Sequence, residues 1–581
     1  MTRFRLATGV LVSAVMSTAL VALPAISAHA APTDCPTAFP TADAVDGVIG
    51  TGYTVERGTT ADPFTATILG RITDGIGPGI DMIMADLSSP ALTRAGGVWE
   101  GMSGSPVYAA NGELIGSVSY GLAGSSPIAG ITPAADMMKL LTPTAAAATT
   151  TKAKIKVSSK VATRIAKTGD VSAAEAGTGF RRLPIPVSVS GASTGSNKFL
   201  KDLTKTAGVR VVTGAASSST TASSPSEITA GSNFAAALSY GDVTVAGVGT
   251  TTFVCNGQAV AFGHPLLGLG KVQYTAHPAS AVYIQPDPIN SPFKVANLGG
   301  PVGVVDLDKT TGIRTELGAT ATTSFPITSS LIPDGGTAVT GSTTDVYQPW
   351  AGDIAAMHLQ SNIVKALGSQ GDGSAALKFT INGTRANGKT FKISRSDHYT
   401  SNGEEDVSYV AADDLYNIVS SLTSQSFDDL KITSVNISGT VSSKISQYRV
   451  TSVKVKKSGK WVSQKGVLKV KAGKSIATQI TMALYRSSKT VTVPLTIKVP
   501  AKTQGASGDL NISDGYDAGY MMSEPKSLTA LINQLNTYPP SDAIVGTLQL
   551  EGPKTVNTVT VKQTGATVSG YAKDLSIQVK F

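Results

Sequence analysis

One serine lies in a sequence context that could make it a nucleophile. Ser103 belongs to the segment Gly101–Pro106 (GMSGSP), between two apolar runs. Glycine on both sides lets the chain turn tightly, and the backbone N–H groups of Gly101 and Ser103 can then point at one spot and hold a developing oxyanion. This arrangement is typical of acyl transfer by a serine. The alternative is a bend between two strands that has no chemical role.

A serine nucleophile needs a base, and the chain has only five histidines. His264 follows an apolar strand and lies between Gly263 and Pro265, so we expect an exposed and rigidly held imidazole at a strand end, as a general base requires. His277, also followed by a proline, is the second candidate. The others are predicted to play no part: His29 in a signal segment, His358 on a surface helix and His398 in a polar loop.

The elements around Ser103 and His264 are predicted to be strands. Val107–Tyr120 has the pattern of a hairpin with Asn111–Gly112 as its turn. Gln258–Ala261 has the pattern of the strand that ends near His264. Gly, Ser, Thr, Ala and Val dominate the composition and long amphipathic helices are scarce, so we expect a mainly β protein.

The chain of 581 residues is too long for one core, and we expect several domains. We predict a signal peptide (1–30), a serine-bearing half of a catalytic domain (31–142), a connector (143–180) and a histidine-bearing half (181–330). An α+β accessory module (331–432) and an immunoglobulin-like sandwich (433–581) follow. Helices are expected at Phe199–Leu203, Asp353–Leu367, Asp413–Leu422 and Leu528–Leu535.

The N-terminus predicts export. Arg3 and Arg5 precede the apolar run Leu6–Leu23, and Ala28–Ala30 supplies the small-x-small cleavage pattern. No later stretch is long and apolar enough to span a bilayer, so we expect a secreted or envelope protein without a membrane span. In an oxidising compartment Cys35 and Cys255 could form a disulfide, and two separate thiols are the alternative.

The net charge of +9 bears on the partners. Many of the positive charges fall in one zone, at Lys454, Lys456, Lys457, Lys460, Lys465, Lys469, Lys471 and Lys474. This zone could attract an anionic cell-wall polymer, or it could be a solvated strand face. We expect no nucleic-acid partner, because the chain has no basic motif interleaved with aromatic residues. We also expect no metal and no cofactor, because no His/Cys/Asp cluster has ligand spacing.

Two stretches resemble a known family. Ala91–Pro106 (ALTRAGGVWEGMSGSP) with Asn111–Val118, and Gly247–Phe253 (GVGTTTF) with Ala261–His264, are similar to the SpoIVB (stage IV sporulation protein B) peptidase family. The resemblance covers roughly residues 44–330 and implies a serine peptidase on a chymotrypsin-like double β-barrel, in which a Gly-Thr-x-Thr-Phe strand leads to the catalytic histidine. In that family the histidine comes first, whereas Ser103 precedes His264 here, so the order looks circularly permuted. The chain shows no PDZ-like module, and the sporulation role is therefore not carried over.

The third catalytic residue is open. The family places an acid at the end of the strand before the serine loop, and Asp86 matches that place, although the loop to Ser103 is longer by about two residues. Asp242 is the rival, and either aspartate could instead serve a turn or a cap. If Asp86 orients the base, it accepts a hydrogen bond from one nitrogen of His264, and the other nitrogen faces Ser103.

The expected function is a secreted serine endopeptidase acting on a protein or peptide. Ser103 would attack the carbonyl carbon, His264 would carry the proton, and the N–H groups of Gly101 and Ser103 would form the oxyanion hole. One alternative is a catalytically silent envelope-binding protein on the same fold. Another is a protein that cleaves only itself, within 144–177.

Overall fold

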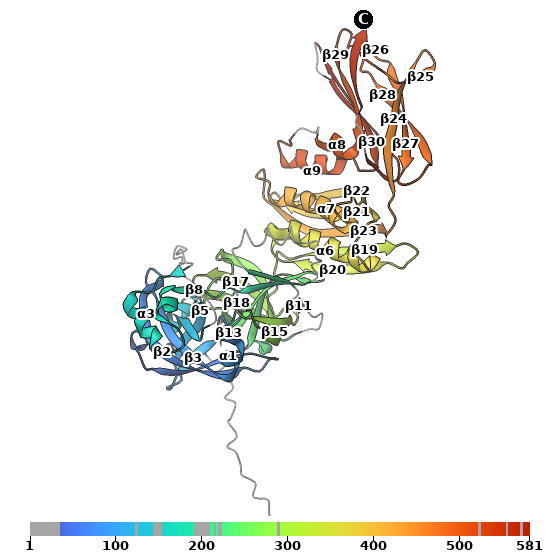
Figure 1. Cartoon of the computed structure of the whole chain (residues 1–581). Coiled ribbons are helices and arrows are strands. Elements are labelled where there is room, and N and C mark those ends of the chain that lie inside the picture. The colour runs from blue at the N-terminus through green and yellow to red at the C-terminus, as the bar shows by residue number, and fades with distance from the viewer. Residues whose placement is uncertain are drawn as a thin grey trace, which may run out of the picture.

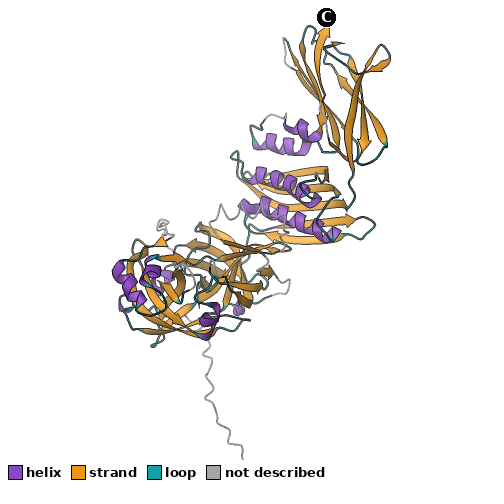
Figure 2. Cartoon of the chain, in the orientation of Figure 1, coloured by secondary structure: helices purple, strands orange, loops and turns teal. Residues whose placement is uncertain are grey.

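The computed structural model describes residues 35–122, 126–142, 154–190, 210–213, 216–218, 223–287, 291–401, 403–520, 524–552, 556–569 and 573–580. The predicted signal peptide and the helix expected at 199–203 lie outside these ranges. The prediction of a mainly β protein is confirmed, and Figure 2 shows β-sheets in both barrels, in the accessory module and in the C-terminal module. The modules follow one another from the two barrels, β1 to β18, to the sandwich at the C-terminus (Figure 1).

Six antiparallel strands close the first barrel. They follow one another around the ring as β1 (Ile49–Thr54), β2 (Asp62–Gly77), β3 (Ile80–Ser88), β6 (Ile128–Pro133), β5 (Leu114–Leu122) and β4 (Pro106–Ala109), and β4 pairs again with β1. The short helix α1 (Pro90–Ala95) and the Ser103 segment connect β3 to β4. The predicted hairpin is present as β4 and β5, with Gly112 at φ 84° in its turn.

Residues 154–180, which we expected to be part of a connector, are folded onto this barrel. They form β7 (Lys154–Ile155), α3 (Ser159–Ala166), α4 (Ala173–Gly177) and the start of β8 (Phe180–Arg182), and β8 pairs with β5. The apolar side chains of Ile155, Ile165 and Phe180 are buried in one cluster with Leu69 and Tyr120 of the barrel. The high content of Ala, Thr and Lys predicted a linker, because the few apolar residues that pack on the barrel are spread among them.

A second ring of six antiparallel strands forms the other barrel. The order is β12 (Asn233–Gly241), β13 (Thr244–Cys255), β14 (Gln258–Ala261), β18 (Gly312–Leu317), β17 (Gly303–Lys309) and β15 (Gly270–Gln285), and β15 pairs again with β12. β9 (Pro186–Ser190) extends this sheet beside β13, with β10 (Arg210–Thr213) on its far side. β16 (Phe293–Leu298) pairs with the distal end of β15 and with β11 (Ala216–Ser218).

The expected boundaries at 330 and 432 both cut strands. β19 (Phe325–Pro333) and β23 (Leu430–Ser442) are parallel neighbours in the accessory module, which also holds β20 (Val339–Asp345), β21 (Ser374–Arg385) and β22 (Thr390–Thr400). Helices α6 (Ala351–Leu367) and α7 (Val407–Thr423), both predicted, pack on this sheet. β20 pairs with β12, so the sheet continues from the second barrel, and a single apolar core runs through both parts.

The C-terminal module is a sandwich of two sheets. One has the order β25 (Lys460–Val462), β24 (Gln447–Lys457), β27 (Ser475–Leu484) and β28 (Thr490–Lys498), with β32 (Thr567–Ser569) also beside β24. The other has the order β26 (Leu468–Lys471), β33 (Lys573–Lys580), β29 (Ser507–Asp514), β30 (Ala543–Glu551) and β31 (Val556–Gln563). Their inner faces share one core. α8 (Gly515–Tyr520) and the predicted helix α9 (Leu528–Thr537) lie between β29 and β30, and α9 packs toward the accessory module.

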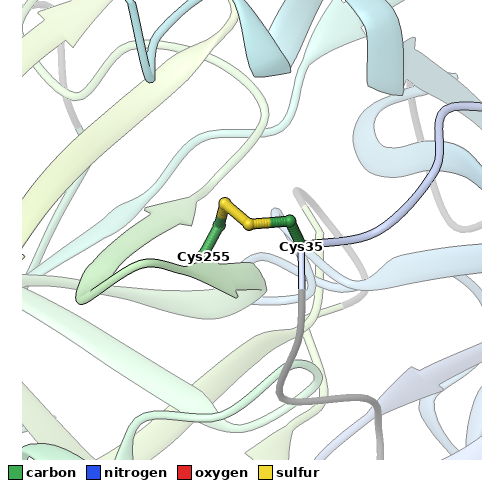
Figure 3. Close-up of a disulfide and its surroundings, with 2 residues drawn as sticks. All are labelled: Cys35 and Cys255. Carbon is green, nitrogen blue, oxygen red and sulfur yellow. A yellow bond between two sulfur atoms is a disulfide. The ribbon is translucent and has the colours of Figure 1, made fainter.

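The two cysteines pair. Cys35 and Cys255 form a disulfide that joins the start of the described chain to the end of β13, across 220 residues (Figure 3). The same N-terminal segment is hydrogen-bonded to the first barrel, through Leu114. The disulfide therefore links the two barrels covalently.

Within the described part of the chain, no helix is both long and apolar enough to cross a membrane.

Candidate active site

The segment that carries Ser103 has the tight backbone that its glycines predict. Gly101 and Gly104 have φ values of 95° and 96°, in the left-handed region that favours glycine. A Cβ atom at Gly104 would collide with the carbonyl oxygen of Thr250. The segment therefore packs so closely against the second barrel that only glycine fits at this position.

Two threonines of β13 hold the serine segment in place. Thr250 Oγ1 donates to the carbonyl oxygen of Gly101 at 3.2 Å, and Thr252 Oγ1 donates to that of Gly104 at 2.8 Å. The backbone N–H of Thr250 donates to the carbonyl oxygen of Ser103 at 2.8 Å. Because alternate residues of a strand share a face, Thr250 and Thr252 both turn toward the first barrel. The Gly-Thr-x-Thr-Phe pattern is thus the docking strand for the serine segment.

The carbonyl groups of this segment are engaged, whereas two of its N–H groups have no acceptor among the described residues. Met102, Gly104 and Ser105 donate their backbone N–H groups to Trp99, Val118 and Met102. No such bond is made by the N–H groups of Gly101 and Ser103. These are the two donors that were expected to form an oxyanion hole, and they remain available to an incoming oxygen.

His264 sits on a strained turn at the end of β14. Phe262 has φ 72°, which is unusual for a bulky residue, and Gly263 has φ 68°. The Phe262 ring packs edge-to-face on Phe234 at 5.7 Å between centroids, and the carbonyl oxygen of Gly263 accepts a 2.7 Å hydrogen bond from Thr132 of the first barrel. A side chain at Gly263 would collide with Ser117 and Ser119. Contacts from both barrels therefore fix the direction of the imidazole.

The structure brings Ser103 and His264 together across the barrel interface. Nε2 of His264 lies 2.9 Å from Oγ of Ser103, and Nδ1 lies 2.9 Å from the carbonyl oxygen of Pro265. Since a carbonyl oxygen only accepts, a neutral imidazole must carry its proton on Nδ1. Nε2 is then the acceptor for the Ser103 hydroxyl proton. The Pro265 carbonyl thus selects the tautomer that a general base needs.

Burial keeps this imidazole neutral. Ser103 and His264 both have 0% exposed area, which corrects the expectation of an exposed base. Burial, helped by the positive charge of Arg182, lowers the pKa of His264 to about 3, and the hydrogen bond to Pro265 opposes this shift. His264 is therefore a proton acceptor over the whole physiological pH range, but the imidazolium formed during proton transfer receives little stabilisation.

A buried carboxylate that the sequence did not reveal holds the loop after His264. Oδ1 of Asp308 accepts the backbone N–H of Leu266 at 2.9 Å, and Oδ2 accepts those of Leu267 and Gly268 at 2.8 and 2.9 Å. Asp308 is fully buried, which raises its pKa, while the three amide hydrogen bonds lower it. This loop begins with Pro265, whose carbonyl oxygen faces His264. Asp308 therefore acts on the loop whose first residue, Pro265, contacts the imidazole.

Neither expected aspartate contacts His264. The interaction partner of Asp86 is Asp170, and burial together with this second carboxyl raises the pKa of Asp86 to about 6. Asp242 accepts from the Ser342 backbone and from Asn362. The place predicted for Asp86 at Nδ1 is taken by the Pro265 carbonyl oxygen, because the tight turn after His264 folds that oxygen back onto the ring.

The remaining described histidines lie elsewhere. His277 is buried on β15, with Nδ1 near the Gly299 carbonyl oxygen and Nε2 near Thr275. His358 was expected at the surface but is fully buried between Ser329 and Thr343, because α6 covers the sheet with its polar side chains as well as its apolar ones. His398 was expected in a loop but lies on β22, 3.4 Å from a carboxylate oxygen of Asp542.

A lysine lies beneath the serine segment. Lys294 on β16 is fully buried, its backbone N–H donates to the Glu100 carbonyl oxygen, and Nζ donates to Asn233 Oδ1 at 2.7 Å. A Cβ atom at Gly101 would lie 2.8 Å from Lys294 Cβ. Burial lowers the pKa of Lys294 to about 7. No sequence signal pointed to this residue, which lies far along the chain from Ser103.

The described residues include no group of three or more His, Cys, Asp or Glu side chains placed to hold a metal ion. The site brings together a serine, a neutral histidine and two backbone N–H groups that have no acceptor among the described residues. Compared with known proteins, the chain matches no family model, no curated protein and no solved structure.

Proposed function

We propose that the protein is a serine peptidase whose nucleophile is Ser103 and whose general base is His264. The observation that carries the proposal is the 2.9 Å separation of Ser103 Oγ and His264 Nε2, made by two barrels that contribute one residue each. If Ser103 and His264 were merely two buried polar side chains in contact, there would be no reason for a carbonyl oxygen to select the tautomer of the histidine. There would also be no reason for two N–H donors without an acceptor beside the serine. The Ser103–His264 contact, the carbonyl and the two N–H donors together favour acyl transfer.

The residues fit the steps of that reaction. His264 Nε2 takes the hydroxyl proton as Ser103 Oγ bonds to the substrate carbonyl carbon, and the N–H groups of Gly101 and Ser103 face the resulting oxyanion. His264 then gives the proton to the leaving amine, and an acyl-enzyme remains. Water, activated by the same nitrogen, attacks the ester carbonyl, releases the acid and returns the proton to Ser103.

The family proposal is a permuted chymotrypsin-like double barrel related to the SpoIVB peptidases. It is supported by two closed six-stranded barrels that meet at Ser103 and His264, with the serine barrel first. The Gly-Thr-x-Thr-Phe strand that the family resemblance singled out holds the serine segment. The Cys35–Cys255 disulfide supports export to an oxidising compartment, where the substrate would be a protein or peptide.

The test is covalent labelling of the mature protein by a fluorophosphonate probe. We expect one site of labelling, at Ser103, that disappears in Ser103→Ala and falls at least a hundredfold in His264→Ala. Ser105→Ala is the matched control, because Ser105 is also buried in the segment but donates its hydroxyl to Met102. Labelling that persists in Ser103→Ala would refute the assignment.

A catalytically silent binding protein is the second candidate, and one observation favours it. Ser103 and His264 are both fully buried, so a substrate reaches them only if the covering residues move. A silent protein would remain unlabelled by small and large fluorophosphonates alike, even with mild denaturant added to open the site. Self-cleavage within 144–177 is a third outcome, although residues 154–177 are folded onto the barrel.

A further inference from the structure

The first sheet of the sandwich carries positive charge that nothing in its own strands balances. β24, β25, β27, β28 and β32 contain no Asp or Glu. Between Asp429 and Asp509 the chain has thirteen lysines, two arginines and no carboxylate. These fifteen charges exceed the net charge of +9 of the whole chain, so the rest of the protein is net negative. The positive charge is concentrated in one module.

Several of these charges share a face with an exposed tryptophan. Lys454 and Lys456 are two residues apart on β24 and point to the same side, while Val455 between them is buried in the core. Trp461 of β25 lies directly opposite Lys456, whose Nζ is 5.7 Å from the indole centroid. Trp461 is 38% exposed, whereas the other two tryptophans, Trp99 and Trp350, are buried.

The hairpin tip carries two more charges in an unfavourable pairing, on the side of the strands opposite to Lys456 and Trp461. Lys457 lies directly opposite Lys460, across a two-residue turn in which Ser458 and Gly459 have φ values of 44° and 82°. Like charges at directly opposite positions destabilise a strand pair. Among the described residues neither lysine forms an ion pair. The free protein gains nothing from this pairing, whereas an anionic partner would neutralise it.

The rest of the face is polar. Gln479 and Thr481 of β27 lie beside Lys454 and Ser452 in register, and Thr492 of β28 follows Thr481. These side chains alternate with buried residues such as Ile480 and Met482, so they point outward. Short polar side chains leave a surface over which an extended chain can lie.

We propose that this face, defined by Lys454, Lys456 and Trp461 and flanked at the hairpin tip by Lys457 and Lys460, binds an acidic polysaccharide. A sugar ring presents a flat apolar surface to the indole, and the carboxylates or phosphates of the polymer pair with the lysines. A polymer with charge alone would leave Trp461 unused, and a neutral glycan would leave the lysines unused. The proposal does not depend on the peptidase activity, and the expected export places such polymers within reach.

The experiment compares three polymers with the purified full chain. Polygalacturonate supplies sugar rings and charge, dextran supplies sugar alone, and polyphosphate supplies charge alone. Binding is followed by isothermal titration calorimetry and by acrylamide quenching of tryptophan fluorescence, because Trp461 is the exposed indole among the three. We expect polygalacturonate to bind most tightly, to protect Trp461 from the quencher and to bind less tightly as salt rises.

Variants test which residues are used. Lys454→Gln with Lys456→Gln, and separately Trp461→Ala, should each weaken polygalacturonate binding roughly tenfold. Lys389→Gln with Lys392→Gln is the control, since it removes two exposed charges from the accessory module. The proposal fails if polyphosphate, duplex DNA or phosphatidylglycerol vesicles bind as tightly as polygalacturonate. It also fails if Trp461→Ala, with its fold verified by circular dichroism, binds as the parent chain does.

Discussion

At the scale of single residues, no carboxylate among the described residues is hydrogen-bonded to the histidine of the candidate site. His264 is held by the Pro265 carbonyl oxygen, which selects the tautomer but adds no negative charge. In a triad an aspartate both selects the tautomer and stabilises the imidazolium. Here the carboxylate of Asp308 instead accepts from the backbone of the loop that begins at Pro265. We regard Asp308 as a positioning residue.

Replacing Asp308 by Asn tests this role. The side-chain amide keeps only one acceptor oxygen, so its NH2 group must face the backbone N–H of Leu266 or those of Leu267 and Gly268. Each buried donor that is left without an acceptor costs about 1–3 kcal/mol. We expect the fluorophosphonate labelling rate of Ser103 to fall at least tenfold, because the loop moves and His264 loses its direction.

Asp306→Asn on the same strand is the control for Asp308→Asn. Asp306 pairs with Arg314 rather than with the histidine loop, so it should reduce thermal stability without slowing labelling to the same degree. Equal labelling by the Asp308→Asn variant and the parent chain would remove Asp308 from the site.

The buried histidine also predicts an unusual pH profile. Burial lowers the pKa of His264 to about 3, and only the neutral ring accepts a proton, so the base stays active at every pH well above that value. We expect the labelling rate to stay level from pH 8 down to pH 5. A histidine of ordinary pKa would keep only about 3% of its neutral form at pH 5.

The fold at each pH is verified by circular dichroism, and spontaneous hydrolysis of the probe is subtracted. An inflection near pH 6.5 would contradict the expectation, because it would mean that the movement which admits the probe also exposes the His264 imidazole to water.

The sequence singled out the two residues that the structure brings together, but not the residues around them. Ser103 and His264 are found from local signals, a Gly-flanked serine and a histidine at a strand end. Asp308 and Lys294 reach the site through long-range packing and carry no local signal. Asp86 was expected from a strand-end pattern, yet its side chain faces Asp170, because local sequence does not say on which side of a barrel a strand-end residue emerges.

At the scale of elements, β13 connects the two halves of the site. Its N–H and threonine hydroxyl groups hold the serine segment, and its end leads through β14 to His264. The strands β4, β5, β13 and β14 could be predicted from alternation and turn residues. The closure of the rings could not, because the pairings of β1 with β4 and of β12 with β15 join strands that are distant in the chain.

Threonine-to-valine changes on β13 test the docking strand. Valine keeps the shape of threonine but removes the hydroxyl donor, so Thr250→Val and Thr252→Val each leave a carbonyl oxygen of the serine segment without that partner. We expect each to cost about 1 kcal/mol of stability and to slow labelling of Ser103 several-fold.

Thr251→Val is the matched control on the opposite face of the same strand, where Thr251 contacts Ser232. The docking role predicts slower labelling for residues 250 and 252 and the parent rate for residue 251. The same loss of labelling at all three positions would indicate a general loss of stability instead.

At the scale of the whole molecule, the modules are less separate than composition suggested. β12 pairs with β20, and the hydroxyl of Thr343 accepts from the Val243 backbone. Apolar residues of the second barrel and of helices α6 and α7 belong to one core. The limits expected from changes of composition, at 330 and 432, fall inside β19 and β23, because parallel pairing between those strands leaves no local signal.

This continuity predicts where the chain can be shortened. A chain that ends at residue 330 lacks β20, the rest of β19 and α6, so β12 loses a partner and the shared core is exposed to water. We expect it to aggregate or to label slowly. A chain that ends at Ser442 keeps β23 whole and loses only the sandwich with α9. We expect it to be labelled at the rate of the full chain. Its midpoint of thermal unfolding should be lower, because Leu528, Leu531 and Ile532 no longer cover the accessory module. The measurements are the labelling rate and the midpoint of thermal unfolding of each shortened chain. If the chain that ends at residue 330 is labelled and unfolds like the full chain, the barrels are an independent unit. The accessory module then has no part in positioning Ser103 and His264.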